Sequence, residues 1–256
     1  MQHTGVDVPS GLTPFTRRGK SCYHILTMPS WNIHTAHAEL LLRTEGPSAL
    51  GIRNVDAFLL GNLLPDVYVG YMVPDISHKL EYRETHYADP GFVPEPRYWD
   101  FFESYGQRNR DGQVDDLILG TWAHLLADHD YNLQNNRFID ARGIKPGEQT
   151  RIRKQGDFDL FGRTLDISLA PNITPEVLVQ CAAFSQYELY EEDMVKASEA
   201  MRAIVADNAA RHVSGTPDYQ MLDEQFFSST FKLVDAHIRE GLLAYVAGDA
   251  NWGGKH

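Results

Sequence analysis

The sequence is poor in cysteine and has no long apolar run. Its two cysteines, Cys22 and Cys181, are too few for a disulfide framework, and unpaired thiols are typical of a reducing compartment. No stretch of about 18 consecutive apolar residues is present, so the sequence predicts no transmembrane helix. Polar residues between Thr16 and His24 interrupt the N-terminal region, which lacks the continuous apolar segment of a secretory signal. These features predict a cytoplasmic protein.

Positive charge is also scarce. The chain has 23 Lys and Arg against 35 Asp and Glu, which gives a formal net charge of −12. This balance argues against nucleic-acid binding through a basic surface and against a polybasic patch that docks on anionic membranes. The sequence also has no Gly-rich phosphate loop, no Cys-x-x-Cys pair and no Gly-x-Ser-x-Gly nucleophile motif. Binding of phosphate esters through a metal ion stays compatible with the acidic charge.

Helical periodicity dominates the rest of the sequence. Hydrophobic residues make up 43% of the 256 positions, enough for a full core without disulfide bonds. Apolar residues recur at helical spacing, and the expected helices are 32–43, 55–64, 115–133, 175–210 and 225–247. A proline at position 65 is expected to end the second helix, and Gly248 the last one. The pattern predicts an all-α fold, a single-domain bundle of several helices.

Three segments depart from the helical pattern. Residues 1–27 are rich in Gly, Pro and Thr and are expected to form an N-terminal extension before a single helical metal-binding domain at 28–256. Residues 66–98 are aromatic, charged and proline-rich, which predicts a long loop with short helical pieces. Residues 141–172 are interrupted by glycines, including Gly156, and are expected to form an irregular insertion or a short hairpin.

The segment GTWAHLLADHDYN places His124 and Asp128 four residues apart in an apolar run. On a helix, positions i and i+4 share one face. An imidazole and a carboxylate are costly to bury there without partners, and both are ordinary zinc ligands. The pair therefore predicts half of a metal site.

Further candidate ligands precede this pair. His34 and His37 lie three residues apart on the first expected helix, Asp66 follows a proline at a helix end, and the loop supplies His78 and His86. The residues alone leave open whether His34 or His37, and whether His78 or His86, binds the ion.

His129 comes directly after Asp128 and points about 100° away from it on a helix. It is therefore not expected to bind the same ion. The dipeptide His129-Asp130 offers a different interpretation, an HD-type metal-dependent phosphohydrolase in which this pair supplies the ligands.

The order of these motifs resembles the zinc-dependent phospholipase C family, which includes bacterial phospholipase C and P1 nuclease-like proteins. The resemblance covers residues 28–135 and rests on a Trp-x-x-His helix start, the string GNLLPD, a Thr-His pair and the string HLLAD. It implies an all-helical fold that binds zinc and hydrolyses phosphate esters with a metal-activated water.

Carried over residue by residue, the resemblance implies one zinc bound by Asp66, His86, His124 and Asp128. His34 would bind a neighbouring zinc, with Asp128 as the bridge. Asp66 and Asp128 would then be the catalytic carboxylates.

The secreted family members hold a further zinc with a later His-x-x-x-Glu pair. No histidine after Asp128 is followed by a glutamate at i+4, because His212 is followed there by a threonine and His237 by a glycine. The sequence therefore predicts one or two zinc ions.

The expected partner is a small phosphate ester or a phospholipid head group. Lys79 and Arg83, four residues apart in the loop, are candidates for binding its phosphate. Four protein ligands would also close a tetrahedral structural site, so a non-catalytic helical protein with a structural metal stays an alternative.

Overall fold

The computed structural model describes residues 30–109 and 111–255, and all regular structure within these ranges is helical. This confirms the all-α prediction for the described part of the chain; the expected N-terminal extension and Cys22 lie outside it. The elements are α1 (Trp31–Thr44), the 3₁₀ turn η1 (Ser48–Leu50), α2 (Val55–Gly61), α3 (Leu64–Val67), α4 (Tyr82–His86), α5 (Tyr98–Tyr105), α6 (Asp116–Ala141), α7 (Glu148–Gly162), α8 (Pro175–Ala183), α9 (Glu191–Ala210) and α10 (Glu224–Val246).

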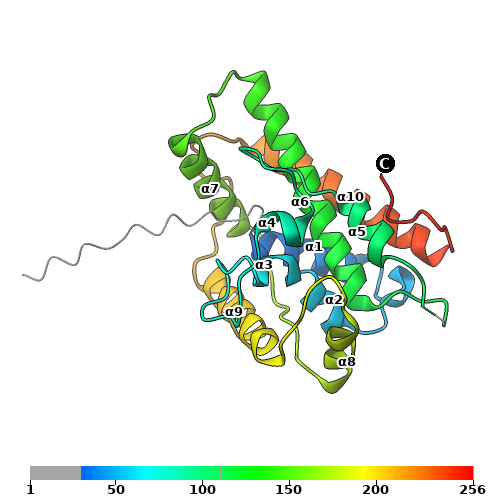
Figure 1. Cartoon of the computed structure of the whole chain (residues 1–256). Coiled ribbons are helices and arrows are strands. Elements are labelled where there is room, and N and C mark those ends of the chain that lie inside the picture. The colour runs from blue at the N-terminus through cyan, green and yellow to red at the C-terminus, as the bar shows by residue number, and fades with distance from the viewer. Residues whose placement is uncertain (1–29, 110, 256) are drawn as a thin grey trace, which may run out of the picture.

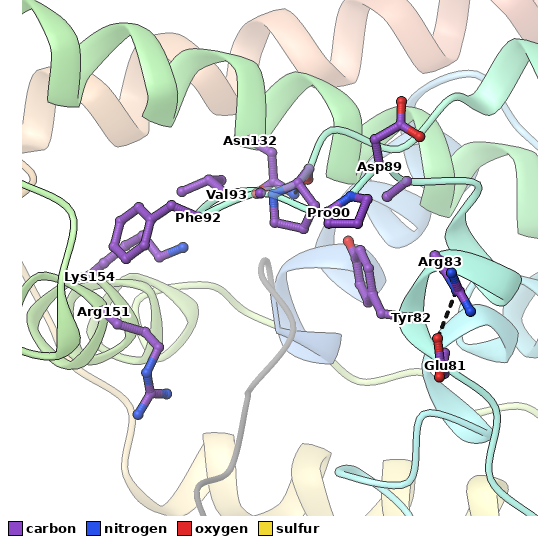
Figure 2. A pocket seen from close by; sticks show the side chains of 13 residues that line it. Glu81, Tyr82, Arg83, Asp89, Pro90, Phe92, Val93, Asn132, Arg151 and Lys154 are labelled. Atoms are coloured by element: carbon purple, nitrogen blue, oxygen red, sulfur yellow. Dashed lines mark hydrogen bonds and ion pairs between the residues drawn. The ribbon is translucent and has the colours of Figure 1, made fainter.

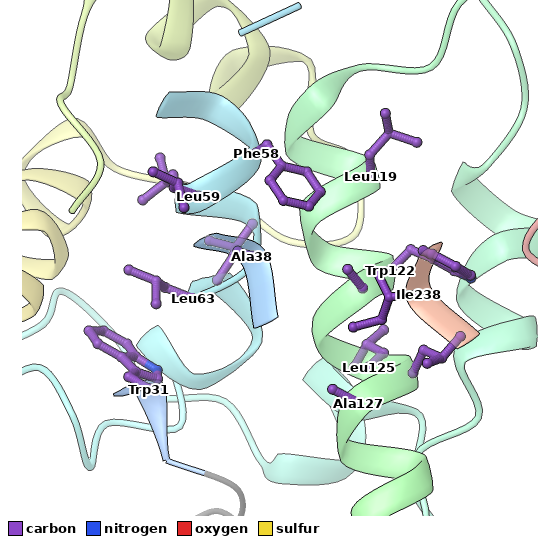
Figure 3. Close-up of a cluster of buried hydrophobic side chains, with 14 of the residues drawn as sticks. Trp31, Ala38, Phe58, Leu59, Leu63, Leu119, Trp122, Leu125, Ala127 and Ile238 are labelled. Carbon is purple, nitrogen blue, oxygen red and sulfur yellow. The ribbon is translucent and has the colours of Figure 1, made fainter. Parts of the chain in front are cut away.

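The long helix α6 runs through the middle of the molecule (Figure 1). It packs most extensively against α2 and α10, and also against α5 and α8. Every residue from 116 to 128 is buried, so this part of α6 is covered on all sides and not on one face only. Figure 3 shows side chains of α1, α2 and α10 gathered around it. The centre of the core is therefore also the segment that carries His124 and Asp128.

Two glycines allow α2 and α6 to approach closely. A Cβ atom built on Gly61 would lie 2.1 Å from the carbonyl oxygen of Leu117, and one on Gly120 would lie 2.0 Å from that of Phe58. Both distances are far below a van der Waals contact, so only glycine fits at either position. This contact sets α2, and the α3 turn that follows it, directly against the metal-ligand candidates of α6.

The predicted irregular insertion at 141–172 is wrong over Glu148–Gly162, because this stretch forms α7. Its buried side chains Lys154, Asp157, Phe158 and Phe161 recur at helical spacing. A Cβ atom added to Gly156 would meet nothing within 4 Å, so this position faces open space. A glycine there costs about 1 kcal/mol relative to alanine, less than the helix gains from burying its other face.

Two predicted helices are divided. The helix expected to end at Pro65 ends at Gly61, and Pro65 instead lies in the first turn of α3, where a proline is tolerated. The helix expected over 175–210 breaks between α8 and α9, where Phe184 has an extended backbone. In this break the Gln186 side chain donates a 2.7 Å hydrogen bond to the Glu84 carbonyl, which fastens α4 to the rest of the fold. No helix in the described ranges has the length and apolarity to cross a membrane.

Candidate metal centre

Five titratable side chains from four helices meet inside the core. They are His34 of α1, Asp66 of α3, His86 of α4, and His124 and Asp128 of α6. Each is between 0% and 1% exposed. Residues separated by up to 94 positions in the sequence therefore form one buried polar cluster, called the metal centre below, in an otherwise apolar core.

The ligand atoms of the metal centre lie close to one another. His86 Nε2 is 3.3 Å from His124 Nε2, 3.4 Å from Asp128 Oδ2 and 3.6 Å from Asp66 Oδ1. His34 Nε2 lies 3.2 Å from Asp128 Oδ1. Two triads among the described residues have the geometry to hold a metal ion, His34 with His124 and Asp128, and Asp66 with His86 and His124. Sharing of His124 between the triads joins them into one centre.

Hydrogen bonds on the outer side of these residues fix their orientation. Trp31 Nε1 donates to Asp66 Oδ2 at 3.1 Å, which leaves Oδ1 directed at His86. His124 Nδ1 lies 2.9 Å from the Asn62 carbonyl oxygen. Such outer partners hold metal ligands in place in known sites. Asp66 and His124 are thus each held by a polar partner on the side away from the other metal-centre residues.

The hydrogen bonds also determine which ring nitrogens carry protons. A carbonyl oxygen only accepts, so Nδ1 of His124 donates to it and Nε2 keeps its lone pair. Thr85 Oγ1 donates its one proton to the Tyr82 carbonyl at 3.2 Å. The same hydroxyl oxygen of Thr85 therefore accepts from Nδ1 of His86 at 2.7 Å. Both Nε2 lone pairs then point into the same space, where they repel each other unless a cation lies between them. The arrangement suits a metal ion.

Burial and neighbouring charges shift the pKa values of the metal-centre residues. Burial, and after it the neighbouring His34, lower the pKa of His124 to about 3. The pKa of His86 is held well below its ordinary value, first by burial and then by the two other histidines. Burial also raises the pKa of Asp128 to about 7. The rings are therefore neutral at physiological pH, which is the form that binds a metal.

The helix α4 carries His86 into the metal centre. A capping box formed by Glu81 and Glu84 starts this short helix. It ends at Tyr87, whose φ of 54° lies in the left-handed region that residues other than glycine rarely adopt. A backbone outlier next to a candidate ligand is typical of a site whose geometry is held by its surroundings.

The structure separates the candidate ligands that the sequence left open. His34 lies in the metal centre, whereas His37 stacks on Phe231 with ring centroids 4.0 Å apart. His86 lies in the metal centre, whereas His78 stacks on Tyr68 at 4.3 Å. His37 and His78 belong to neither metal-capable triad of the described residues.

The dipeptide of the HD-type interpretation lies away from the metal centre. His129 Nδ1 donates to the Pro96 carbonyl at 2.8 Å, and Asp130 Oδ2 lies 2.8 Å from His237 Nδ1. Both side chains thus leave α6 on other sides than Asp128.

The two candidate phosphate-binding residues lie at the surface. Lys79 is exposed and its side chain lies over Gly70. Arg83 is 64% exposed and its Nε lies 2.7 Å from Glu81 Oε2. A cation that the sequence patterns did not reveal lies deeper, the 6% exposed Lys154 of α7. The helical spacing of residues 154, 157, 158 and 161 was the available signal, but the glycines nearby concealed it.

A pocket of about 340 Å³ adjoins the metal centre. Tyr82 forms the wall between them, because it lines the pocket, donates a 2.9 Å hydrogen bond to Asp128 Oδ2 and stacks on His86 at 3.8 Å. Asn132, one helical turn beyond Asp128, and Lys154 line the same pocket.

The chain matches no protein-family model, no curated protein and no solved structure.

Proposed function

We propose that this chain is a zinc-dependent hydrolase of phosphate esters, similar in type to phospholipase C. The observation that carries the proposal is the position of Asp128. One of its oxygens lies 3.2 Å from His34 and the other 3.4 Å from His86. A carboxylate that faces two ligand sets is suited to bridge two metal ions, as in two-metal hydrolytic sites.

The charge of the centre supports a catalytic role. Asp66 and Asp128 are the two carboxylates in it, and together they balance one divalent ion. A second divalent ion, for which His34 would be a ligand, would leave excess positive charge, which suits an anionic phosphate ester. Bound zinc supplies a water molecule acidic enough to act near neutral pH, together with positive charge against the phosphoryl group.

The residues of the chain hold and orient this centre. Trp31 and the Asn62 carbonyl fix the directions of Asp66 and His124. Tyr82 separates the metal centre from the pocket, so its side chain must turn aside for a phosphoryl group to reach Asp128. The substrate class is a small phosphate ester or a phospholipid head group.

One observation favours a second function, a structural metal. The metal-centre residues are at most 1% exposed, and the Tyr82 hydroxyl occupies one oxygen of Asp128. Asp66, His86, His124 and Asp128 lie close enough that they would be the four ligands of a closed tetrahedral site. In this case zinc would stabilise the fold without catalysis.

Metal analysis of untagged protein tests the centre. We expect about two zinc ions per chain in the wild type and loss of zinc in His86→Ala. His78→Ala is the matched control, since His78 lies in the same loop but outside the metal centre, and it should keep its zinc. Protein without any bound zinc would refute the proposed function.

Hydrolysis of bis-p-nitrophenyl phosphate separates the two functions. The zinc-loaded wild type should hydrolyse it, and Asp128→Asn should lose activity while its circular dichroism spectrum stays helical. A chain that holds zinc but hydrolyses neither phosphodiesters nor phosphomonoesters would support the structural alternative.

A further inference from the structure

Lys154 is a buried cation without an ion-paired partner in the described part of the chain. Its side chain is 6% exposed, and within residues 30–109 and 111–255 it makes no hydrogen bond or ion pair. Burial of an uncompensated charge is costly, and the pKa of Lys154 is lowered to about 8, mainly by that burial. An anion bound beside Lys154 would offset this cost.

The ammonium group of Lys154 faces the pocket beside the metal centre. Figure 2 shows it reaching from α7 toward the middle of the pocket, with Phe92 next to it and Tyr82 on the opposite side. Its charge interacts with that of Asp128, behind Tyr82. Lys154 and the metal centre therefore lie on opposite sides of Tyr82, with Lys154 lining the pocket.

The other charges around the pocket are already paired. Arg83 binds Glu81 at 2.7 Å, and Arg97 binds Asp89 at 2.8 Å. The Arg151 guanidinium lies 2.6 Å from the Glu148 carboxylate. Among the described residues, Lys154 is thus the lining cation that is left to attract an anion from solution.

The remaining wall of the pocket is apolar. Phe92, Val93 and two prolines, Pro90 and Pro94, line it, and Lys154 Nζ lies 6.0 Å from the Phe92 ring centroid. A pocket of about 340 Å³ fits a small ligand with one anionic group and one compact apolar group.

We propose that Lys154 binds the phosphoryl group of a phosphate ester whose apolar or aromatic substituent lies against Phe92. This inference rests on the proposed function for the reaction, but the anion site can be tested without it. It replaces Lys79 and Arg83 with Lys154 as the residue that binds the phosphate.

Isothermal calorimetry with phenylphosphonate, an analogue that is not hydrolysed, tests the site. Zinc-loaded and zinc-free protein are both titrated. We expect Lys154→Met and Lys154→Gln to weaken binding about tenfold or more, since a hydrogen bond to a charged group is lost. Arg153→Met is the matched control, because Arg153 is exposed on the same helix, and it should bind as the wild type does. Methylphosphonate, which lacks the ring, should bind more weakly than phenylphosphonate.

The outcomes separate this inference from the proposed function. If phenylphosphonate binding depends on Lys154 while the protein holds no zinc, the anion site is supported and the hydrolase proposal fails. If the wild type hydrolyses phosphate esters and Lys154→Met has the same affinity and KM, the hydrolase proposal stands and this inference is overturned. Equal weakening by Arg153→Met, or no binding by the wild type, also overturns it. Thermal unfolding of each variant checks that the fold is retained.

Discussion

Substitution of Gly120 by alanine tests the contact on which the metal centre depends. In α6, Gly120 lies one helical turn before His124, and a Cβ atom there would lie 2.0 Å from the Phe58 carbonyl oxygen and 2.8 Å from the Asn62 nitrogen. Real Cβ contacts are essentially never shorter than 3.0 Å. Helices α2 and α6 must therefore separate by about 1 Å to admit the methyl group, because backbone atoms cannot turn aside.

The expected cost follows from two opposing effects. Overpacking of a core costs about 1–3 kcal/mol, and more where the obstacle is backbone. Alanine recovers about 1 kcal/mol of helix propensity relative to glycine. We expect a net loss of about 2 kcal/mol in the free energy of unfolding, which lowers Tm by about 4–8 °C in a chain of this size. The separation also moves the Asn62 carbonyl away from His124, so zinc affinity should fall.

Gly156→Ala is the matched control. Gly156 is also inside a helix, but a Cβ atom there meets nothing within 4 Å. This variant should be more stable than the wild type by about 0.5–1 kcal/mol. Urea unfolding followed by circular dichroism gives both free energies, and a competing zinc dye gives the affinity. A Gly120→Ala variant as stable as Gly156→Ala would refute the close packing of α2 on α6.

Three further predictions concern the support of the metal centre. Trp31→Phe removes the hydrogen bond to Asp66 and should weaken zinc binding about 10–100-fold in a competition assay; unchanged affinity would show that Asp66 does not depend on the indole. Tyr82→Phe removes the donor to Asp128 and should lower the free energy of unfolding of zinc-free protein by about 1–3 kcal/mol in urea; an unchanged value would show that this hydrogen bond does not stabilise the fold. In zinc-free protein, burial raises the pKa of Asp128 from 3.8 to about 7, so the folded state binds more protons than the unfolded state between these values. The unfolding free energy of the wild type relative to Asp128→Asn should therefore fall by about 1.4 kcal/mol for each unit that the pH rises across that window. Curves of unfolding free energy against pH that stay parallel for the two proteins would contradict the raised pKa.

The local patterns of the sequence were sufficient for the helical fold class and for one half of the metal centre. The four-residue spacing of His124 and Asp128 places both on one helix face wherever that helix lies. Apolar periodicity identified α1, α6 and α10, because each buries a large helical surface. It failed for α7, where glycines and charged residues on the exposed side concealed a buried face.

The tertiary structure decided which polar residues meet. His34 and His37 are both at most 1% exposed and lie on the same helix, so their own spacing cannot distinguish them. Packing turns His34 toward Asp128 and His37 toward Phe231. The close approach of α2 and α6 and the placement of α7 depend on contacts between residues far apart in the chain. Sequence spacing determines which residues share a helix face, but only the packing of that helix against others determines what the face contacts. For this reason the burial of Lys154, and the pocket that it lines, follow from the tertiary structure and not from the sequence.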